Sequence, residues 1–197
     1  MSTVSMTRPT ITASTGQHRT HSRRRPWYPW LLTALAFPPA GYIANVVAGR
    51  VDSVPAAVLA GLLAGAGIGA AQWALLRRRG VSLTWIPATA AGLGAGLAAG
   101  AALVSYRTDI TSLALMGAVS GLAVGVAQGA MLGNAKRMLG WSATTAAVWA
   151  LGWTVTTAAG IDVSQQWPVF GAAGCLTLAF VQSIIIGAFV PAKAVKS

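Results

Sequence analysis

The sequence predicts an all-α membrane protein whose six transmembrane helices form three two-helix hairpins around a pseudo-threefold axis. Three observations predict it: long apolar runs, basic residues on one side of those runs, and an internal repeat. The 197 residues are 55% hydrophobic and only 9% charged, and their mean hydropathy is +0.63. Soluble domains carry about 25% charged residues, so the composition excludes the ordinary globular class.

Six apolar runs are long enough to cross a bilayer, which requires about 20 mostly apolar residues. They lie near residues 30–49, 55–76, 85–105, 112–133, 141–160 and 169–190. No run carries a charge near its centre, and the intervening loops are too short for an extramembrane domain. We therefore expect a transmembrane domain over 27–191. A basic tail over 1–26, without acidic residues, is expected to be disordered and cytoplasmic, and 192–197 to be a short cytoplasmic tail.

Adjacent prolines interrupt the first run, since Pro38 and Pro39 lie midway along it. They remove two N–H donors, so we expect the helix to kink or break there. Discontinuous helices often mark transport sites. Because only this run has the proline pair, we interpret the break as structural.

The formal net charge of +11 suggests a nucleic-acid partner, but the positions of the charges argue against one. In a regularly weaving chain, 12 of the 14 basic residues fall on one side. They are Arg8, Arg19, Arg23, Arg24, Arg25, Arg77, Arg78, Arg79, Lys136, Arg137, Lys193 and Lys196. Only Arg50 and Arg107 fall on the other side. This asymmetry predicts cytoplasmic N- and C-termini in a bacterial plasma (inner) membrane, with the basic residues contacting anionic lipid headgroups.

Five landmarks recur three times in the same order. A Trp opens each odd-numbered run, and a Gly follows it eleven residues later. An Asp lies in the next loop. Each even-numbered run ends with a Gln, and another Gly lies eleven residues before that Gln. The sets are Trp30, Trp85 and Trp141; Gly41, Gly96 and Gly152; Asp52, Asp109 and Asp162; Gln72, Gln128 and Gln182; and Gly61, Gly117 and Gly171. The landmarks define repeats over about 27–80, 81–137 and 138–191.

Each two-helix unit returns the chain to the same side, so the copies share one orientation and an axis along the membrane normal relates them. The even runs carry small residues at four-residue intervals, on one helical face. The stripes are Gly61, Gly65 and Gly69; Gly117, Gly121 and Gly125; and Gly171 with Cys175. Such stripes let helices approach closely, so we expect the even runs to form an inner layer. The third run has its own stripe, which leaves the opposite arrangement open.

The repeat brings Gln72, Gln128 and Gln182 to one depth in the cytoplasmic half. Their amides are either interhelical hydrogen-bonding groups worth about 0.6–2 kcal/mol each, or the lining of a polar constriction. We favour the first interpretation, because a close-packed glycine-rich bundle leaves no lumen.

The three acidic residues, Asp52, Asp109 and Asp162, could form an external ring that gathers cations. We favour solvated loop residues, because Arg50 and Arg107 each precede an Asp by two positions. Trp149 and Trp153 lie one helical turn apart and could contact a pigment or quinone, although packed or lipid-facing aromatic residues are the ordinary interpretation.

Enzymatic chemistry has little support, because no apolar run holds an ionisable side chain that could act as acid, base or ligand. His-Glu-x-x-His, nucleophile-elbow and Walker-type motifs are missing. His18 and His21 are a weak metal signal in the tail, and a single cysteine excludes a multi-cysteine site. We predict a non-enzyme without metal or cofactor.

The stretches GAGIGAAQWALLRRR, WIPATAAGLGAG and GLAVGVAQGAML resemble a group of uncharacterised bacterial multi-pass membrane proteins with glycine-rich hairpins ending in Gln or Gln-Trp. The resemblance covers residues 55 to 155 and implies a family but no activity. Two hypotheses follow: a packing or accessory protein that binds other membrane proteins, or itself, through glycine-rich faces, or a small channel or transporter with a Gln-lined path on the axis.

Overall fold

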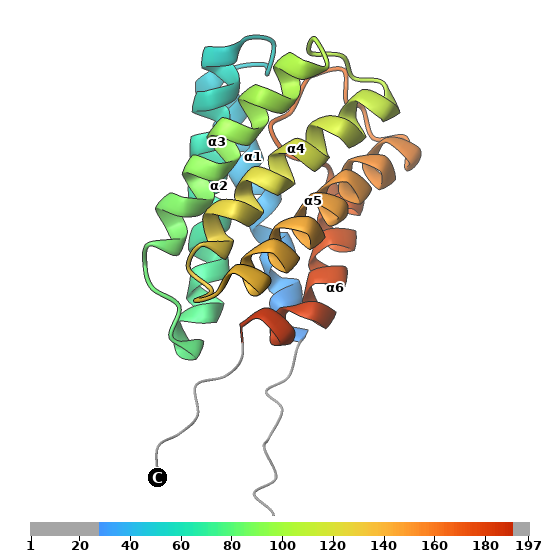
Figure 1. The fold of residues 1–197 in the computed structure, drawn as a ribbon. Coiled ribbons are helices and arrows are strands. Elements are labelled where there is room, and N and C mark those ends of the chain that lie inside the picture. The colour runs from blue at the N-terminus through green and yellow to red at the C-terminus, as the bar shows by residue number, and fades with distance from the viewer. Residues whose placement is uncertain (1–27, 191–197) are drawn as a thin grey trace, which may run out of the picture.

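The computed structural model describes residues 28–190, so both expected tails, with His18 and His21, lie outside the described residues. The described chain is all-α (Figure 1). Its elements are the 3-10 segment η1 (Tyr28–Ala36), α1 (Phe37–Ala48), α2 (Val54–Leu76), the 3-10 turn η2 (Arg77–Arg79), α3 (Trp85–Leu103), α4 (Ile110–Gly129), α5 (Ala135–Ala158) and α6 (Ala172–Phe189). The six helices confirm the predicted helical class.

Five helices are long and apolar enough to cross a membrane. They span Pro29–Ala48, Val54–Arg79, Trp85–Leu103, Ile110–Gly129 and Ala172–Phe189. The exception is α5, which has 24 residues but includes Lys136, Arg137 and several hydroxyl side chains. Ser142, Thr144, Thr154, Thr156 and Thr157 each donate to the carbonyl four residues earlier, at 2.7–3.0 Å. These hydroxyls are therefore satisfied within the helix and need no water.

Consecutive helices run antiparallel, so the loops fall at two ends of the bundle (Figure 1). The Asp end holds the loops 49–53, 104–109 and 159–171, each with one aspartate. The Arg end holds η2 and the loop 130–134, together with the start of η1 and the end of α6.

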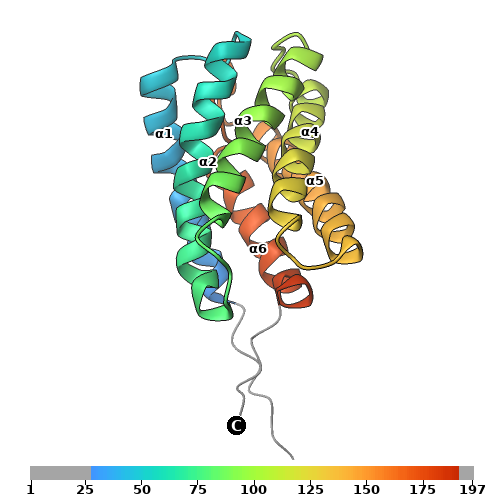
Figure 2. The ribbon, with the colours of Figure 1, turned by 60° about the vertical axis from the view of Figure 1, so that its left-hand side comes forward.

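The helices form one ring in chain order (Figure 2). Each helix packs mainly on its neighbours in sequence, and η1 packs on α6 to close the ring. Within the described bundle α2, α4 and α6 do not pack on one another, so the expected inner layer of even helices is wrong. The reason is that the stripe glycines of α2 and α4 face the next odd helix, while Gly174 of α6 faces α5. A Cβ on Gly61 would lie 2.6 Å from Gly94 Cα of α3, and one on Gly125 would lie 2.6 Å from Ser142 Cα of α5.

At Pro38 and Pro39, where a kink or break was expected, the first span stays helical over Pro29–Ala48 but changes its type of helix. The first span is a 3-10 helix up to Ala36 and an α-helix from Phe37 onward, with the prolines in the first turn of α1. A missing N–H costs little there, because first-turn amides have no intrahelical partner. The nine-residue 3-10 segment is unusually long for that geometry. The change of helix type divides the closing seam, which we define as η1 and α1 against α6: η1 packs on α6, whereas α1 hardly touches it.

Candidate functional site

A layer of buried Trp and Gln side chains crosses the bundle near the Arg end. Trp85 Nε1 donates to Gln72 Oε1 at 3.0 Å, and Trp141 Nε1 donates to Gln128 Oε1 at 3.0 Å. Each donor follows its acceptor by thirteen residues, which carries the chain from one helix through a loop into the first turns of the next helix. The same local geometry is therefore made twice.

The two Trp–Gln pairs are joined through Gln128. Its Nε2 donates to Gln72 Oε1 at 2.9 Å and to Thr89 Oγ1 at 2.8 Å. Thr89 in turn donates to the Trp85 carbonyl at 2.7 Å. The resulting network links α2, α3, α4 and α5, so it connects helices that have no direct backbone packing, such as α2 and α4.

The remaining Trp and Gln landmarks lie in the closing seam. Trp30 belongs to η1 and Gln182 to α6, the two elements that close the ring. Trp30 Nε1, Gln182 Oε1 and Thr145 Oγ1 are buried and have no hydrogen-bond partner among residues 28–190. A donor and an acceptor that are paired at two other places are thus left unpaired here.

The layer is buried among apolar side chains. Gln72, Gln128 and Gln182 are 3%, 1% and 1% exposed. The indoles belong to an apolar cluster at the Arg end, the Trp cluster, made of Trp30, Leu76, Trp85, Leu132, Trp141, Ile186 and Val190. Chemically, this arrangement can hold helices together, because its amides accept and donate but carry no titratable proton.

The three loop aspartates all lie exposed at the Asp end. Asp109 caps α4 by accepting from Ser112 N at 3.0 Å and Ser112 Oγ at 2.6 Å, and lies 3.8 Å from Arg107 Nε. Hydrogen bonds from Ser112 and, more weakly, the Arg107 charge lower the pKa of Asp109. Asp162 accepts from Ser164 N at 2.9 Å, and hydrogen bonds from Ser164 lower its pKa too. Both carboxylates are therefore anions at neutral pH.

Gln166 joins the three loops of the Asp end, and the sequence repeat did not reveal it. Its Nε2 donates to the Tyr106 carbonyl at 2.8 Å, its Oε1 accepts from Arg50 Nε at 3.3 Å, and its carbonyl accepts from Val51 N at 3.1 Å. Arg50 also donates to the Ser164 carbonyl at 2.9 Å. Gln166 has a φ of +54°, a left-handed conformation that costs a residue with a Cβ about 1–2 kcal/mol.

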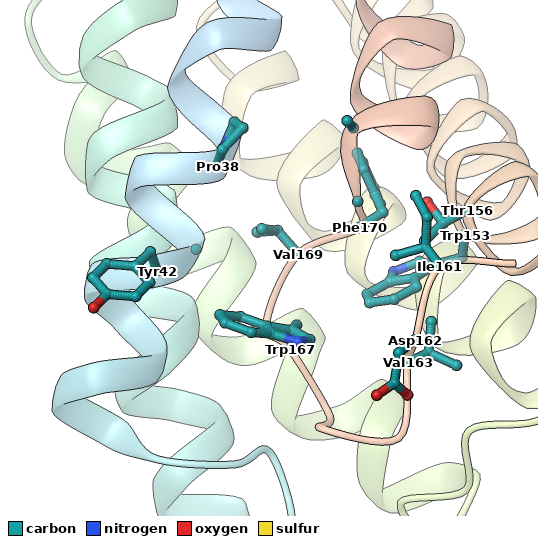
Figure 3. Close-up of a pocket in the computed structure, with 13 residues that line it drawn as sticks. Pro38, Tyr42, Trp153, Thr156, Ile161, Asp162, Val163, Trp167, Val169 and Phe170 are labelled. Atoms are coloured by element: carbon teal, nitrogen blue, oxygen red, sulfur yellow. The ribbon is translucent and has the colours of Figure 1, made fainter. Parts of the chain in front are cut away.

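A cavity of about 460 Å³ lies in the closing seam, on its Asp-end side. Figure 3 shows its lining side chains, which come from α1, α5, α6 and the loop 159–171. Pro38 lies at one end of the cavity, and Asp162 lies toward the other (Figure 3). The walls are mostly apolar and include the aromatic side chains of Tyr42, Trp153, Trp167 and Phe170.

Trp149 and Trp153 are packed rather than lipid-facing. Both are 3% exposed and meet Phe170 edge to face, with ring centroids 5.3 and 5.8 Å apart. Phe37 stacks on Phe170 with ring centroids 5.3 Å apart. Of these four rings, Trp153 and Phe170 line the cavity.

Gly171 and Cys175 complete the small-residue positions. A Cβ on Gly171 would lie 2.7 Å from Ile161 Cδ1, and Cys175 Sγ donates to the Phe170 carbonyl at 3.2 Å. Over residues 28–190, no three His, Cys, Asp or Glu side chains lie close enough to share a metal ion.

The Gln side chains and the glycine stripes were found from the sequence as candidates, whereas the indole donors, Gln166 and the cavity were not. The equal spacing of Trp and Gln was visible in the repeat, and it was the available signal for their pairing. No protein-family model matches the chain, and no curated protein or solved structure is significantly similar to it.

Proposed function

We propose that this chain is a non-enzymatic integral membrane protein built from three hairpins around a pseudo-threefold axis, and that it acts as a packing or accessory protein. The observation that carries the proposal is the Trp–Gln layer. The amides of Gln72 and Gln128 make hydrogen bonds to indoles and to each other. A polar conduction path needs groups that face a lumen, and these groups face protein.

The recurring pair supports the threefold repeat. Trp85 with Gln72 and Trp141 with Gln128 have the same separation and the same donor–acceptor distance. Trp30 and Gln182 are the corresponding residues of the remaining repeat positions, and they lie on opposite sides of the seam between η1 and α6. All three Trp side chains belong to the Trp cluster at the Arg end.

The glycine faces have a different role from the one first expected. Gly61, Gly65 and Gly69 pack on α3, whereas Gly117, Gly121 and Gly125 pack on α5. These faces lie inside the bundle, so they hold the protein itself together. An accessory role is therefore exercised through the outer aliphatic surface, which includes Leu35, Leu139 and Ile184, or through the seam cavity.

The Arg end is assigned to the cytoplasm of a bacterial plasma membrane. Its support is the basic side chains of η2 and of the start of α5, against Arg50 and Arg107 at the Asp end. With α5 taken as a sixth span, both ends of the described chain lie on the cytoplasmic side. The outer surface then contacts lipid.

The test replaces Gln72, Gln128 and Gln182 by Leu together and compares the purified protein in liposomes with the wild type. A packing protein has no K⁺ or proton flux in either form, and its triple variant folds with reduced thermal stability, because indole donors lose their acceptors. Wild-type flux that the triple variant abolishes would overturn the proposal.

A second candidate function, a small channel or transporter, is favoured by the unpaired atoms of the seam. Trp30 Nε1 and Gln182 Oε1 are the kind of buried polar groups that hydrate readily, and they leave the layer incomplete at one place. Under this alternative the double variant Trp30→Phe with Gln182→Leu would remove flux, whereas Trp85→Phe would leave it unchanged.

A further inference from the structure

We propose that the cavity in the closing seam is a binding site for one amphiphilic molecule that has an apolar body and a cationic head. The body would lie against Trp153, Val169 and Phe170, and the head would lie beside Asp162. The inference goes beyond the accessory role proposed above and depends only on the membrane setting of the bundle.

The size and walls of the cavity fit a small amphiphile. Its volume of about 460 Å³ falls within the roughly 300–1,000 Å³ of ordinary ligand pockets. Such pockets are mostly apolar with a few polar groups that orient the ligand. Here Trp153, Val169 and Phe170 are buried apolar walls, and the carboxylate of Asp162 is the charged group of the lining.

The cavity borders the lipid-facing surface of α1. Tyr42 is 63% exposed, and Pro38 is also exposed, although both lie within the candidate span Pro29–Ala48. In a bilayer that surface faces hydrocarbon, so an apolar molecule dissolved in the membrane can enter sideways. The loop 159–171 places Asp162 at the interfacial end of the same cavity, where a polar head would be (Figure 3).

The charge at the rim selects a cation. Within residues 28–190 Asp162 makes no ion pair, and the Arg50 side chain instead donates to Ser164 and Gln166. An anionic head would be repelled by the carboxylate, and a neutral head would gain no Coulomb energy from it. Trp167 and Tyr42 add aromatic rings, whose faces attract cations through their quadrupoles.

The position of the cavity at this seam has a structural reason. The α2–α3 and α4–α5 contacts are closed by glycines that allow backbone approach, as at Gly61 and Gly121. At the closing seam the first span changes from a 3-10 helix to an α-helix just before Pro38. η1 packs along α6, whereas α1 diverges from α6. The space left between α1 and the end of the loop 159–171 is the cavity.

The experiment uses photoreactive amphiphiles with the protein in zwitterionic nanodiscs. Three probes share one hexadecyl chain with a diazirine and differ only in the head: trimethylammonium, maltoside or sulfate. Labelled peptides are mapped by mass spectrometry. We expect the trimethylammonium probe to label α1 and the loop 159–171 about fivefold more than the maltoside probe, the factor for one unit charge at about 4 Å in a water-like rim. The sulfate probe is expected to label least.

Two variants, each with a matched control, separate the body and head contributions. Ala172→Trp fills the cavity from α6 and should abolish saturable labelling, whereas Leu176→Trp, one turn further along and outside the lining, should not. Asp162→Asn should make labelling by the trimethylammonium and maltoside probes equal, whereas Asp52→Asn in another Asp-end loop should leave their difference intact. Equal labelling of the wild type by all three probes overturns the proposal, since ordinary lipid then occupies the cavity. So does labelling that persists in a folded Ala172→Trp variant.

Discussion

Trp141 Nε1 donates a hydrogen bond of 3.0 Å to Oε1 of Gln128, thirteen residues earlier in the chain, and both side chains are buried. Trp85 and Gln72 repeat this relationship, whereas Trp30 and Gln182 lie in the same layer without it. The difference between made and unmade pairs leads to the first prediction.

Replacing each Trp of the layer by Phe should have graded effects on stability. Trp141→Phe removes the indole donor of Gln128 Oε1 and should destabilise most, by about 1–2 kcal/mol. Trp85→Phe should cost about half as much, since Gln72 Oε1 still accepts from Gln128. Trp30→Phe should be neutral or stabilising, because it removes a buried donor that has no partner among the described residues. Thermal unfolding in nanodiscs measures the order, and a Trp30→Phe variant less stable than Trp141→Phe would contradict it.

Glycine at the α2–α3 contact should be irreplaceable. A Cβ on Gly61 would lie 2.6 Å from Gly94 Cα and 2.6 Å from the Leu93 carbonyl oxygen, both of them backbone atoms that cannot turn aside. Gly61→Ala should therefore separate the helices and destabilise the protein by about 1–3 kcal/mol. The control is Gly187→Ala, where nothing lies within 4 Å of the added Cβ. This change should stabilise by about 0.5–1 kcal/mol through helix propensity. Equal melting temperatures of the two variants would refute the close contact.

The side chain of Gln166 should keep the loops of the Asp end ordered. Gln166→Ala keeps the left-handed backbone of this residue but removes the bonds to Tyr106 and Arg50. We expect faster hydrogen exchange in the loop 159–171 and little change in the amides of α2 or α3, because the Trp–Gln layer is distant from that loop. Gln166→Gly should be more stable than Gln166→Ala by about 1 kcal/mol, since glycine adopts positive φ without strain. The exposed neighbour Gln165, changed to Ala, is the control, and similar exchange in both Ala variants would exclude the role of Gln166.

Binding of the trimethylammonium probe should follow the ionisation of Asp162. Hydrogen bonds from Ser164 lower the pKa of Asp162 below its usual 3.8, so the carboxylate stays charged from pH 8 down to that value. The probe has no titratable group. Labelling should therefore stay constant over pH 8 to 5 and fall only as pH drops through the lowered pKa, where the carboxylate is neutralised. The Asp162→Asn variant should have a flat profile. A decline centred near pH 6 would show that another group controls binding.

The sequence by itself determined the helical membrane class and its periodic landmarks. Long apolar runs leave no other way to satisfy backbone hydrogen bonds in lipid, and this reasoning needs no tertiary contact. The helix irregularity at Pro38 also followed from local chemistry, because proline lacks an amide hydrogen wherever it stands. The sequence also singled out Gln72, Gln128 and Gln182, uncharged amides in apolar runs, and all three side chains are buried.

Only the tertiary structure decided which surfaces those residues meet. A stripe such as Gly61 and Gly65 shows that some helix comes close, but its period is the same whether the neighbour is α3 or another even helix. Trp141 pairs with Gln128 because the turn between α4 and α5 reverses the chain, so that residues thirteen positions apart lie side by side. Gln166 and the seam cavity depend on loops and on the divergence of α1 from α6, and these arise from contacts between residues more than a hundred positions apart, which no local pattern encodes.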